Sequence, residues 1–385
     1  MLKVLQAVLL RVNPKSIRSV SIPGCSFSLL KRDFRGRFSF HELDRSRFLT
    51  SGVIMEEKIT IDDIAEALGV SKTTVSRAVS GKGRISDGTR SRVLAYIDKH
   101  NYRPNPMARG LAKRKTYNIA VVWPEDYEAV DLPFFHRCVL GVNRVVAEAG
   151  YDIIISMVDS ENYTNLKRVV ENKKIDGVIL TRTLIDDKPA KYLKESGIPF
   201  VAIGSSDDPE IIQIDNNNFE ACRELTNILI SKGTKRVAII GGDSNHVITR
   251  TRFRGFAEAF KDNGLSYDPE LVFLDSDDPI KIMSIIDEII DKKVDTVICM
   301  DDAIAGQVIT KCRNEMIRVP DDIKVASFYN STILNNMTPS ITSLNFDDTN
   351  LGAVAAKTLM DVINGKKVKN RTESSYEIIL KDSTK

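Results

Sequence analysis

Cationic and hydroxyl side chains gather at the start of one short predicted helix. Its outer face, near the N-terminal end, carries Lys72, Thr73, Ser76 and Arg77. An arginine can donate two hydrogen bonds to a guanine edge, a threonine can contact a base edge or a thymine methyl, and lysine and serine can hold phosphates. This set therefore suits the reading of double-stranded DNA through its major groove.

Three predicted helices must position these side chains. The first has an apolar face with the spacing i, i+3, i+4, i+7, made of Ile61, Ile64, Ala65 and Leu68. Gly69 can take the positive φ that ends a helix, and Ser71 is the predicted N-cap of the second helix. On that second helix Val75 and Val79 point inward. From this pattern alone, an ordinary helical hairpin with a solvated second face stays open.

The third predicted helix starts after Ser86, a candidate N-cap, and ends before Pro104. We expect it to bury Val93, Leu94 and Ile97. Together the three helices would form a small DNA-binding head.

The same stretch resembles the DNA-binding signature of the lactose-repressor (LacI/GalR) family. The matching residues read Thr60-Ile61-x-Asp63-Ile64-Ala65-x-x-Leu68-Gly69-Val70-Ser71-x-Thr73-Thr74-Val75-Ser76-Arg77-Ala78-Val79-Ser80. A second block, Asn101-Tyr102-Arg103-Pro104-Asn105 and Ala108-x-x-Leu111-Ala112, follows at the family's distance, and a weaker match runs from about residue 56 to 381. The resemblance implies a transcriptional regulator with a head, a hinge helix and an effector-binding core.

The resemblance also implies DNA contacts beyond the outer helix face. The predicted set is Thr60, Ser71, Lys72, Thr73, Thr74, Ser76, Arg77, Ser80, Arg84, Asn105, Arg109, Leu111 and Ala112. In the family, two hinge helices lie in the minor groove, and the leucine that Leu111 matches wedges into the central base step. Such a wedge costs roughly a few kcal/mol in unstacking. A hinge this short, weakened by Gly110, should become helical only against its dimer mate on DNA.

The net charge of +3 hides an asymmetry along the 385 residues. Ten Lys and Arg against three Asp and Glu give +7 over residues 1–54, and thirteen against seven give +6 over 55–115. The remainder, with 32 against 42, carries −10. Only the basic part should attract phosphates. The five scattered cysteines indicate reduced thiols, and no apolar run is long enough to predict a membrane span.

We expect four regions. Residues 1–54 are an extra segment, either a disordered basic arm or a misassigned start, because family members usually begin near the position of Met55. Residues 56–102 form the helix-turn-helix domain, 103–115 the hinge helix, and 116–385 the effector-binding and dimerisation core.

From residue 117 the pattern alternates between strands and helices, which predicts parallel sheets with right-handed crossovers. The predicted strands are 118–123, 152–157, 177–181, 200–203, 236–240, 296–300 and 324–327. The resemblance implies two lobes like those of a periplasmic sugar-binding protein, with chain crossings near Asp215, Asn345 and Tyr376. Lobe 1 would span about 116–214 and 345–375, and lobe 2 about 215–344 and 376–385. The predicted fold class is α/β, with a three-helix head and a two-lobed, periplasmic-binding-protein-like core.

Ligands of such folds bind at the carboxyl ends of strands, here between the lobes. The predicted effector contacts are Trp123, Phe135, Arg252, Asp301, Phe328 and Tyr329. Aromatic faces can stack on sugar rings, and an arginine fork can bind vicinal hydroxyls or a carboxylate. Other roles stay open: core packing for Trp123 and Phe135, a surface salt bridge for Arg252, and a helix N-cap for Asp302.

The candidate cleft departs from the family pattern. Many members have Gly-Phe/Tyr-Asp-Asp where this chain has Ser327-Phe328-Tyr329-Asn330, and Gly204 replaces a common acid. Both changes put the identity of the effector in doubt. Thr181-Arg182-Thr183 and Val247-Ile248-Thr249-Arg250 resemble the maltose-regulator branch, which hints at an α-glucoside.

The expected function is a dimeric, cytoplasmic DNA-binding regulator, a repressor whose operator affinity responds to a small molecule, taken to be a sugar. We predict no catalytic residue, metal site or cofactor, because no phosphate-loop, His-Glu-x-x-His or Gly-x-Ser-x-Gly motif is present. The alternative is a sugar-binding receptor whose DNA-binding head does not function. An intact recognition helix argues against that alternative.

Overall fold

The computed structural model describes residues 59–81, 83–102, 110, 114–125, 133–159, 161–276 and 278–385. The predicted extra segment, residues 1–54, lies outside these ranges. The chain divides into two compact units, Met1–Pro104 and Asn105–Lys385. We describe each unit by itself.

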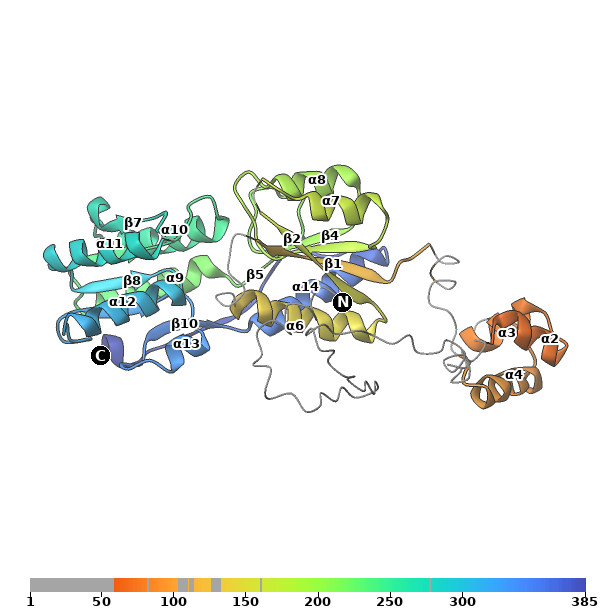
Figure 1. Cartoon of the computed structure of the whole chain (residues 1–385). Coiled ribbons are helices and arrows are strands. Elements are labelled where there is room, and N and C mark those ends of the chain that lie inside the picture. Colours follow the sequence, from red (N-terminus) through yellow and green to blue (C-terminus); the bar gives the residue numbers. More distant parts are fainter. Residues whose placement is uncertain are drawn as a thin grey trace, which may run out of the picture. The chain divides into compact units, whose positions relative to one another are not determined.

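The first unit is built from helices α2 (Ile61–Leu68), α3 (Lys72–Ser80) and α4 (Asp87–Lys99) (Figure 1). Gly69 ends α2 with φ 64°, and the side chain of Ser71 caps α3 by accepting a hydrogen bond from the Thr74 amide at 3.1 Å. Ser86 caps α4 in the same way, through the Thr89 amide. All three predicted helix boundaries are confirmed at these residues.

A small apolar core holds the head together. Ile64, Val75 and Val93, one from each helix, are fully buried, and Ile97 packs against them. Leu94 does not, because 44% of its surface is exposed, which corrects its predicted burial. It lies one residue, or about 100°, around α4 from Val93, and Tyr96 supplies the contact instead.

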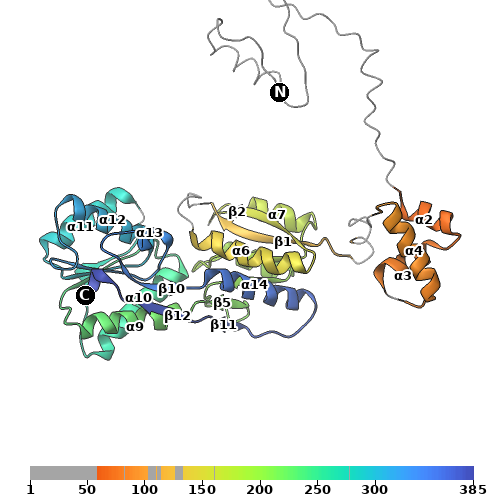
Figure 2. The ribbon, with the colours of Figure 1, turned by 90° about the horizontal axis from the view of Figure 1, so that it is seen from below.

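The first lobe of the second unit is a six-stranded parallel sheet in the order β11-β5-β4-β3-β1-β2. Its strands are β1 (Asn118–Pro124), β2 (Asp152–Val158), β3 (Gly177–Leu180), β4 (Phe200–Ile203), β5 (Gln213–Asp215) and β11 (Arg371–Glu373). Helices α6 (Pro133–Glu148) and α14 (Asp348–Ile363) cover one face, and α7 (Thr164–Glu171) and α8 (Lys188–Ser196) cover the other (Figures 1 and 2). Because both faces are covered, β1 is buried over almost its whole length.

The second lobe repeats this arrangement in the order β12-β10-β9-β8-β6-β7. Its strands are β6 (Val237–Ile240), β7 (Val272–Phe273), β8 (Thr296–Cys299), β9 (Lys324–Ser327), β10 (Thr342–Phe346) and β12 (Tyr376–Ile379), the last antiparallel to β10. Helices α9 (Asn218–Ser231) and α10 (Val247–Asp262) lie on one face, and α11 (Pro279–Asp291) and α12 (Asp302–Asn314) on the other (Figure 2). The short elements η3 (Pro269–Leu271), α13 (Thr332–Asn335) and η4 (Asp382–Thr384) complete it.

The chain passes between the two sheets three times: after β5, between β10 and α14, and between β11 and β12. The predicted α/β class with parallel sheets is confirmed. No helix in the described part of the chain is long and apolar enough to span a membrane.

Candidate functional site

The outer face of α3 is open. Lys72, Thr73, Ser76 and Arg77 are exposed, while Val75 and Ala78 on the opposite side are buried in the head. The Lys72 ammonium lies 2.7 Å from the Asp62 carboxylate, in a pair in which both side chains are more than half exposed. Such a pair is weakly held, so Lys72 can exchange it for a phosphate. The helix thus presents a polar, cationic face of the kind that fits a major groove.

Arg77 is guided by the loop that follows α3. Gly83 has φ 93°, and a Cβ atom placed there would lie 3.0 Å from Cδ of Arg77. Glycine at this position therefore leaves room for the aliphatic part of the arginine side chain. The loop at Gly83 thus lies against the Arg77 side chain.

Some of the predicted DNA contacts already serve the head itself. Thr60 forms a capping box with Asp63, and the hydroxyls of Ser71 and Thr74 lie 2.9 Å apart. Ser80, the last residue of α3, and Arg84, in the loop that follows it, are exposed. The remaining predicted contacts lie outside the described residues: Asn105, Arg109, Leu111 and Ala112. Nothing in the structure tests contact with DNA, so the whole set stays a prediction.

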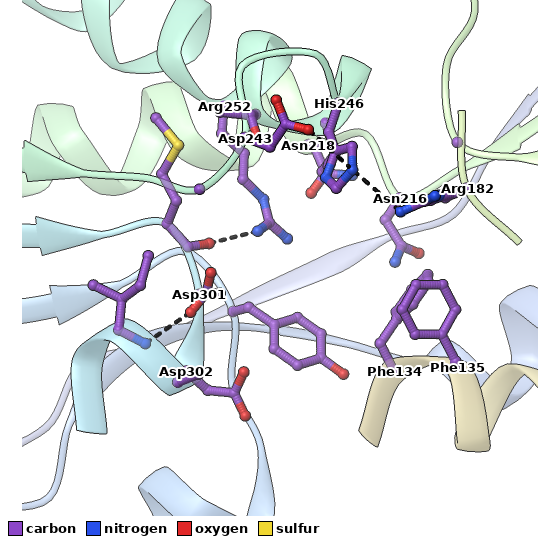
Figure 3. A pocket seen from close by; sticks show the side chains of 18 of the residues that line it. Phe134, Phe135, Arg182, Asn216, Asn218, Asp243, His246, Arg252, Asp301 and Asp302 are labelled. Atoms are coloured by element: carbon purple, nitrogen blue, oxygen red, sulfur yellow. Dashed lines mark hydrogen bonds and ion pairs between the residues drawn. The ribbon is translucent and has the colours of Figure 1, made fainter. Parts of the chain in front are cut away.

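A cavity of about 720 Å³ lies between the two lobes of the second unit (Figure 3). It collects residues from the carboxyl ends of strands in both sheets, as expected for a doubly wound fold. Figure 3 shows Phe134 and Phe135 on one side and Arg252 with Asp301 and Asp302 on the other. An aromatic wall opposite a polar wall suits a ligand with apolar ring faces and a polar rim.

Four of the six predicted effector contacts line this cavity: Phe135, Arg252, Asp301 and Tyr329. Trp123 lies behind the lining and packs on Phe135, with 6.1 Å between ring centroids. Phe328 is fully buried in the core of the second lobe. We correct both assignments: Trp123 supports the aromatic wall from behind, and Phe328 points into the sheet-helix core because neighbouring side chains beyond a strand alternate in direction.

The polar wall is anchored to the backbone. A guanidinium N–H of Arg252 donates to the carbonyl of Met300, and Asp301 caps α12 by accepting from the Ile304 amide at 2.8 Å. Burial raises the pKa of the Asp301 carboxyl. The cap role left open for Asp302 therefore belongs to Asp301, and Asp302 is available to face the cavity.

Tyr329 connects the lobes at the cavity. Its hydroxyl donates to Oδ2 of Asp348 at 2.6 Å, and the Arg137 guanidinium lies 3.6 Å from the same oxygen. Asp348 is almost fully buried at the start of α14, and this burial, partly offset by the hydrogen bond from Tyr329 and by Arg137, raises its pKa to about 6. Sequence reasoning missed Asp348, although the acidic pair Asp347-Asp348 after an apolar run could have indicated it.

Two amides after β5 also escaped prediction. Asn216 and Asn218 line the cavity, and the Asn218 amide donates to Oδ1 of Asp215 at 3.0 Å. They were missed because β5 spans only three residues and its pattern is too short to recognise. Arg252 was predicted because it follows a strand that could be recognised. Asn216 and Asn218 would have been predicted in the same way if β5 had been recognised.

A second link joins the lobes across the cavity. The amide of Ile185 donates to the Asn245 carbonyl at 3.0 Å, and the amide of Val247 to the Thr183 carbonyl at 3.2 Å. Beside them, Nη1 of Arg182 lies 3.2 Å from Nε2 of His246 (Figure 3). Among the described residues there is no cluster of His, Cys, Asp or Glu that could hold a metal ion.

Comparison with known proteins supports this architecture. Residues 60–105 match the model for bacterial regulatory proteins of the lacI family, and residues 226–384 match a periplasmic binding protein-like domain. The transcriptional regulator MalR of Streptococcus pneumoniae serotype 4 is 31% identical over 329 residues, which cover 80% of this chain and 94% of MalR. The chain belongs to the LacI family of bacterial regulatory proteins.

Other LacI-family proteins match over similar lengths. Catabolite control protein A of Staphylococcus xylosus is 28% identical over 80% of this chain and 93% of its own. A CelR–cellobiose complex is 27% identical with a TM-score of 0.64, covering 84% of this chain and 99% of CelR. A lac repressor dimer bound to operator and an anti-inducer has a TM-score of 0.72 at 21% identity, and the match covers 85% of this chain and 99% of the lac repressor chain. At this identity the match shows the fold alone.

Membership of the LacI family confirms the resemblance carried by the helix-turn-helix signature. As a LacI-family chain it is a DNA-binding transcriptional regulator, and MalR and CelR are named as transcriptional regulators rather than as enzymes. In this chain Tyr329 lines the cavity, and its hydroxyl donates to the buried Asp348.

Proposed function

We propose that this LacI-family chain is a repressor that binds a near-palindromic operator as a homodimer and responds to a saccharide bound between its lobes. The observation that carries this proposal is the cavity with one aromatic and one polar wall, in a chain that also has a recognition helix. Two-fold protein symmetry calls for two-fold DNA, with each α3 reading one half-site. The proposal places the protein in the cytoplasm and assigns it no catalysis, cofactor or metal.

The relatives support each part of the proposal. A solved structure holds CelR in complex with cellobiose, and the lac repressor has been crystallised as a dimer on its operator. MalR is a transcriptional regulator of the same family. Carried over to this chain, these facts favour a disaccharide-sized effector and a dimeric DNA-bound form.

Coupling between the two ligands would run through the angle between the lobes. Effector binding would change that angle, move the attachment points of the hinge and order or melt the hinge helices. Effector and operator affinities would then depend on each other reciprocally, by about 1–3 kcal/mol. The wedge role of Leu111 belongs to this scheme and stays a prediction from the sequence.

The test starts from an operator selected in vitro with the full chain from random DNA. Fluorescence anisotropy then follows operator release during titration with maltose, cellobiose, trehalose and glucose. We expect at least one sugar to weaken operator binding about fivefold or more, in line with the coupling above. Failure to select any DNA sequence would favour the sugar-receptor alternative, and unchanged operator affinity with every sugar would remove the saccharide effector.

Arg252→Ala provides the matched control. Arg252 lies in the cavity and far along the sequence from the head, so the variant should keep its operator affinity and lose its response to the sugar. Loss of both properties together would mean that the substitution damages the fold.

A further inference from the structure

We propose that the cleft selects an uncharged, hydroxyl-rich ligand and rejects its phosphorylated form, with the carboxylate of Asp302 as a selectivity-determining group. This inference rests on the proposed function, because it concerns the same cavity. It goes further by assigning the charge of the ligand, which neither the family match nor the names of the relatives determine.

The first argument is the charge of the lining. Five carboxylates line the cavity: Asp215, Asp243, Asp278, Asp301 and Asp302. Only two guanidinium groups, Arg182 and Arg252, do so within the described part of the chain. This excess of negative charge opposes a phosphate or a carboxylate on the ligand.

The second argument is that carboxylates of the chain already lie near the cations, although Nε of Arg252 is buried without a hydrogen-bond partner among the described residues. The charge of Arg252 acts on Asp301 and Asp348, and that of Arg182 on Asp187 and Asp159. Arg137, just outside the lining, pairs with Asp348. An incoming phosphate would therefore compete with carboxylates that the protein itself supplies.

The third argument concerns the helix N-termini that point at the cavity. Helix N-termini are common phosphate sites because their free N–H groups point at the ligand. Here Asp278 caps α11, Asp301 caps α12 and Asp347 caps α14, each by accepting a backbone N–H. At α11 and α12, whose N-cap residues line the cavity, a carboxylate of the chain thus occupies the position that a phosphate would use, whereas the first turns of α9 and α10, which also line it, have no side-chain cap.

The fourth argument is the set of polar atoms that still need a partner. Oδ1 of Asn216, Oδ1 of Asn218 and Oε1 of Gln307 are buried around the cavity without a hydrogen-bond partner among the described residues. The Asn216 and Asn218 amide nitrogens face Asp348 and Asp215, which fixes the direction of both oxygens. These acceptors require donors, which the hydroxyl groups of a sugar supply and its phosphate group does not, whereas the buried Nε–H of Arg252 requires an acceptor.

Of the five carboxylates that line the cavity, Asp302 is the one whose charge can be removed without disturbing a hydrogen bond to the backbone. The other four carboxylates each accept a backbone N–H and so support a loop or a helix end. Asp302 is buried, lines the cavity and makes no hydrogen bond to a described residue. Its charge can therefore be removed with little loss of local structure.

The experiment measures dissociation constants for the full chain by calorimetry, with each neutral sugar beside its phosphorylated form. The probes are glucose and glucose 6-phosphate, trehalose and trehalose 6-phosphate, and maltose and maltose 6′-phosphate. We expect at least one neutral sugar to bind and its phosphorylated form to bind at least tenfold more weakly. Equal or tighter binding of a phosphorylated form overturns the inference and leaves the proposed function intact, whereas no binding by any sugar overturns both.

Two variants test whether Asp302 sets the selectivity for the neutral sugar. Asp302→Asn should reduce the ratio between the neutral and phosphorylated sugar at least threefold. Asp321→Asn removes the same charge from an exposed loop and should leave that ratio unchanged. A folded Asp302→Asn variant with the wild-type ratio would show that Asp302 does not set the selectivity.

Discussion

At the scale of single residues, Asp348 links stability to pH in an unusual direction. Several aspartates among the described residues, such as Asp262 beside Arg223, have a lowered pKa and stabilise the fold above their titration range. The pKa of Asp348 is raised from 3.8 to about 6, so the native state binds this proton more tightly than the unfolded chain does. Its contribution is therefore fully present below about pH 4 and is lost as the pH rises through 6.

We predict that Asp348→Asn removes this pH-dependent contribution. An asparagine resembles the protonated acid and does not titrate, so the stability of wild type relative to the variant should fall between pH 4 and 6.5. The pKa shift corresponds to about 3 kcal/mol over that range. Urea denaturation of both proteins at a series of pH values measures the difference, and a difference independent of pH would contradict the assignment.

Tyr329→Phe is the companion variant. The Tyr329 hydroxyl favours the charged form of Asp348 through its hydrogen bond. Without that hydroxyl the pKa of Asp348 should rise further, so the transition in relative stability should move to a higher pH. A midpoint that stays in place would show that the hydrogen bond does not act on the charge.

Arg77 is the residue of the recognition helix with the most specific expected role. Its side chain is exposed on α3 and can donate two hydrogen bonds to one guanine. Arg77→Ala should weaken operator binding by about 1–3 kcal/mol and relax the base preference at one position. Repeating the in vitro selection with the variant is the measurement, and an unchanged sequence preference would refute this contact.

At the scale of elements, the loop between α3 and α4 affects recognition through its glycines. Gly81 and Gly83 both have a positive φ, but only Gly83 faces the Arg77 side chain. Gly83→Ala and Gly81→Ala should each strain the backbone, at a cost of roughly 1 kcal/mol in head stability.

Only Gly83→Ala should also displace Arg77 and reduce operator affinity beyond the loss of stability. Gly81→Ala is the matched control, because a Cβ at that position meets no atom within 4 Å. Thermal unfolding and anisotropy measured on both variants separate the two effects. Equal losses of DNA affinity would show that the contact with Arg77 does not matter.

Elements with a strong local signal could be predicted from the sequence. The helix boundaries at Gly69, Ser71 and Ser86 follow from capping chemistry, which acts within a few residues. The predicted strands 200–203 and 324–327 coincide with β4 and β9, since buried parallel strands are continuous apolar runs. Strands β5, β7 and β11 have two or three residues each, and their pairing depends on the rest of the sheet, so no local pattern reveals them.

The same dependence on a local sequence pattern explains which residues of the candidate site could be predicted. Arg252 and Asp301 follow strands that could be recognised, and both line the cavity. Asn216 follows β5, which could not be recognised. Asp348 and Tyr329 meet only because the chain crosses between lobes, and their contact spans nineteen positions in sequence, which no periodicity encodes.

At the scale of the whole core unit, the lobes are joined by more than the three chain crossings. The amides of Ile185 and Val247 bond to carbonyls of the opposite lobe, with Leu184 and His246 paired between them. Opening of the cleft must break these bonds, whereas bonds within a sheet, such as that from Phe328 to the Cys299 carbonyl, can persist.

We predict that the amides of Ile185 and Val247 exchange with solvent faster than those of the central strands in the ligand-free protein. A bound sugar should slow their exchange, because it favours the closed arrangement. Hydrogen exchange followed by NMR at these positions provides the test. Protection equal to that of β8 and β9 would mean that the lobes do not open without global unfolding.

The crossings also set the order in which a newly made chain can mature. The head ends with α4 at Lys99, but the first sheet is incomplete until β11 has been synthesised, at Glu373. At roughly 5–20 residues per second, that interval lasts about 14–55 s. A nascent chain therefore carries a finished head, followed by a basic hinge segment, for many seconds before it has a cleft, and during that time its attraction to DNA is outside the control of any effector.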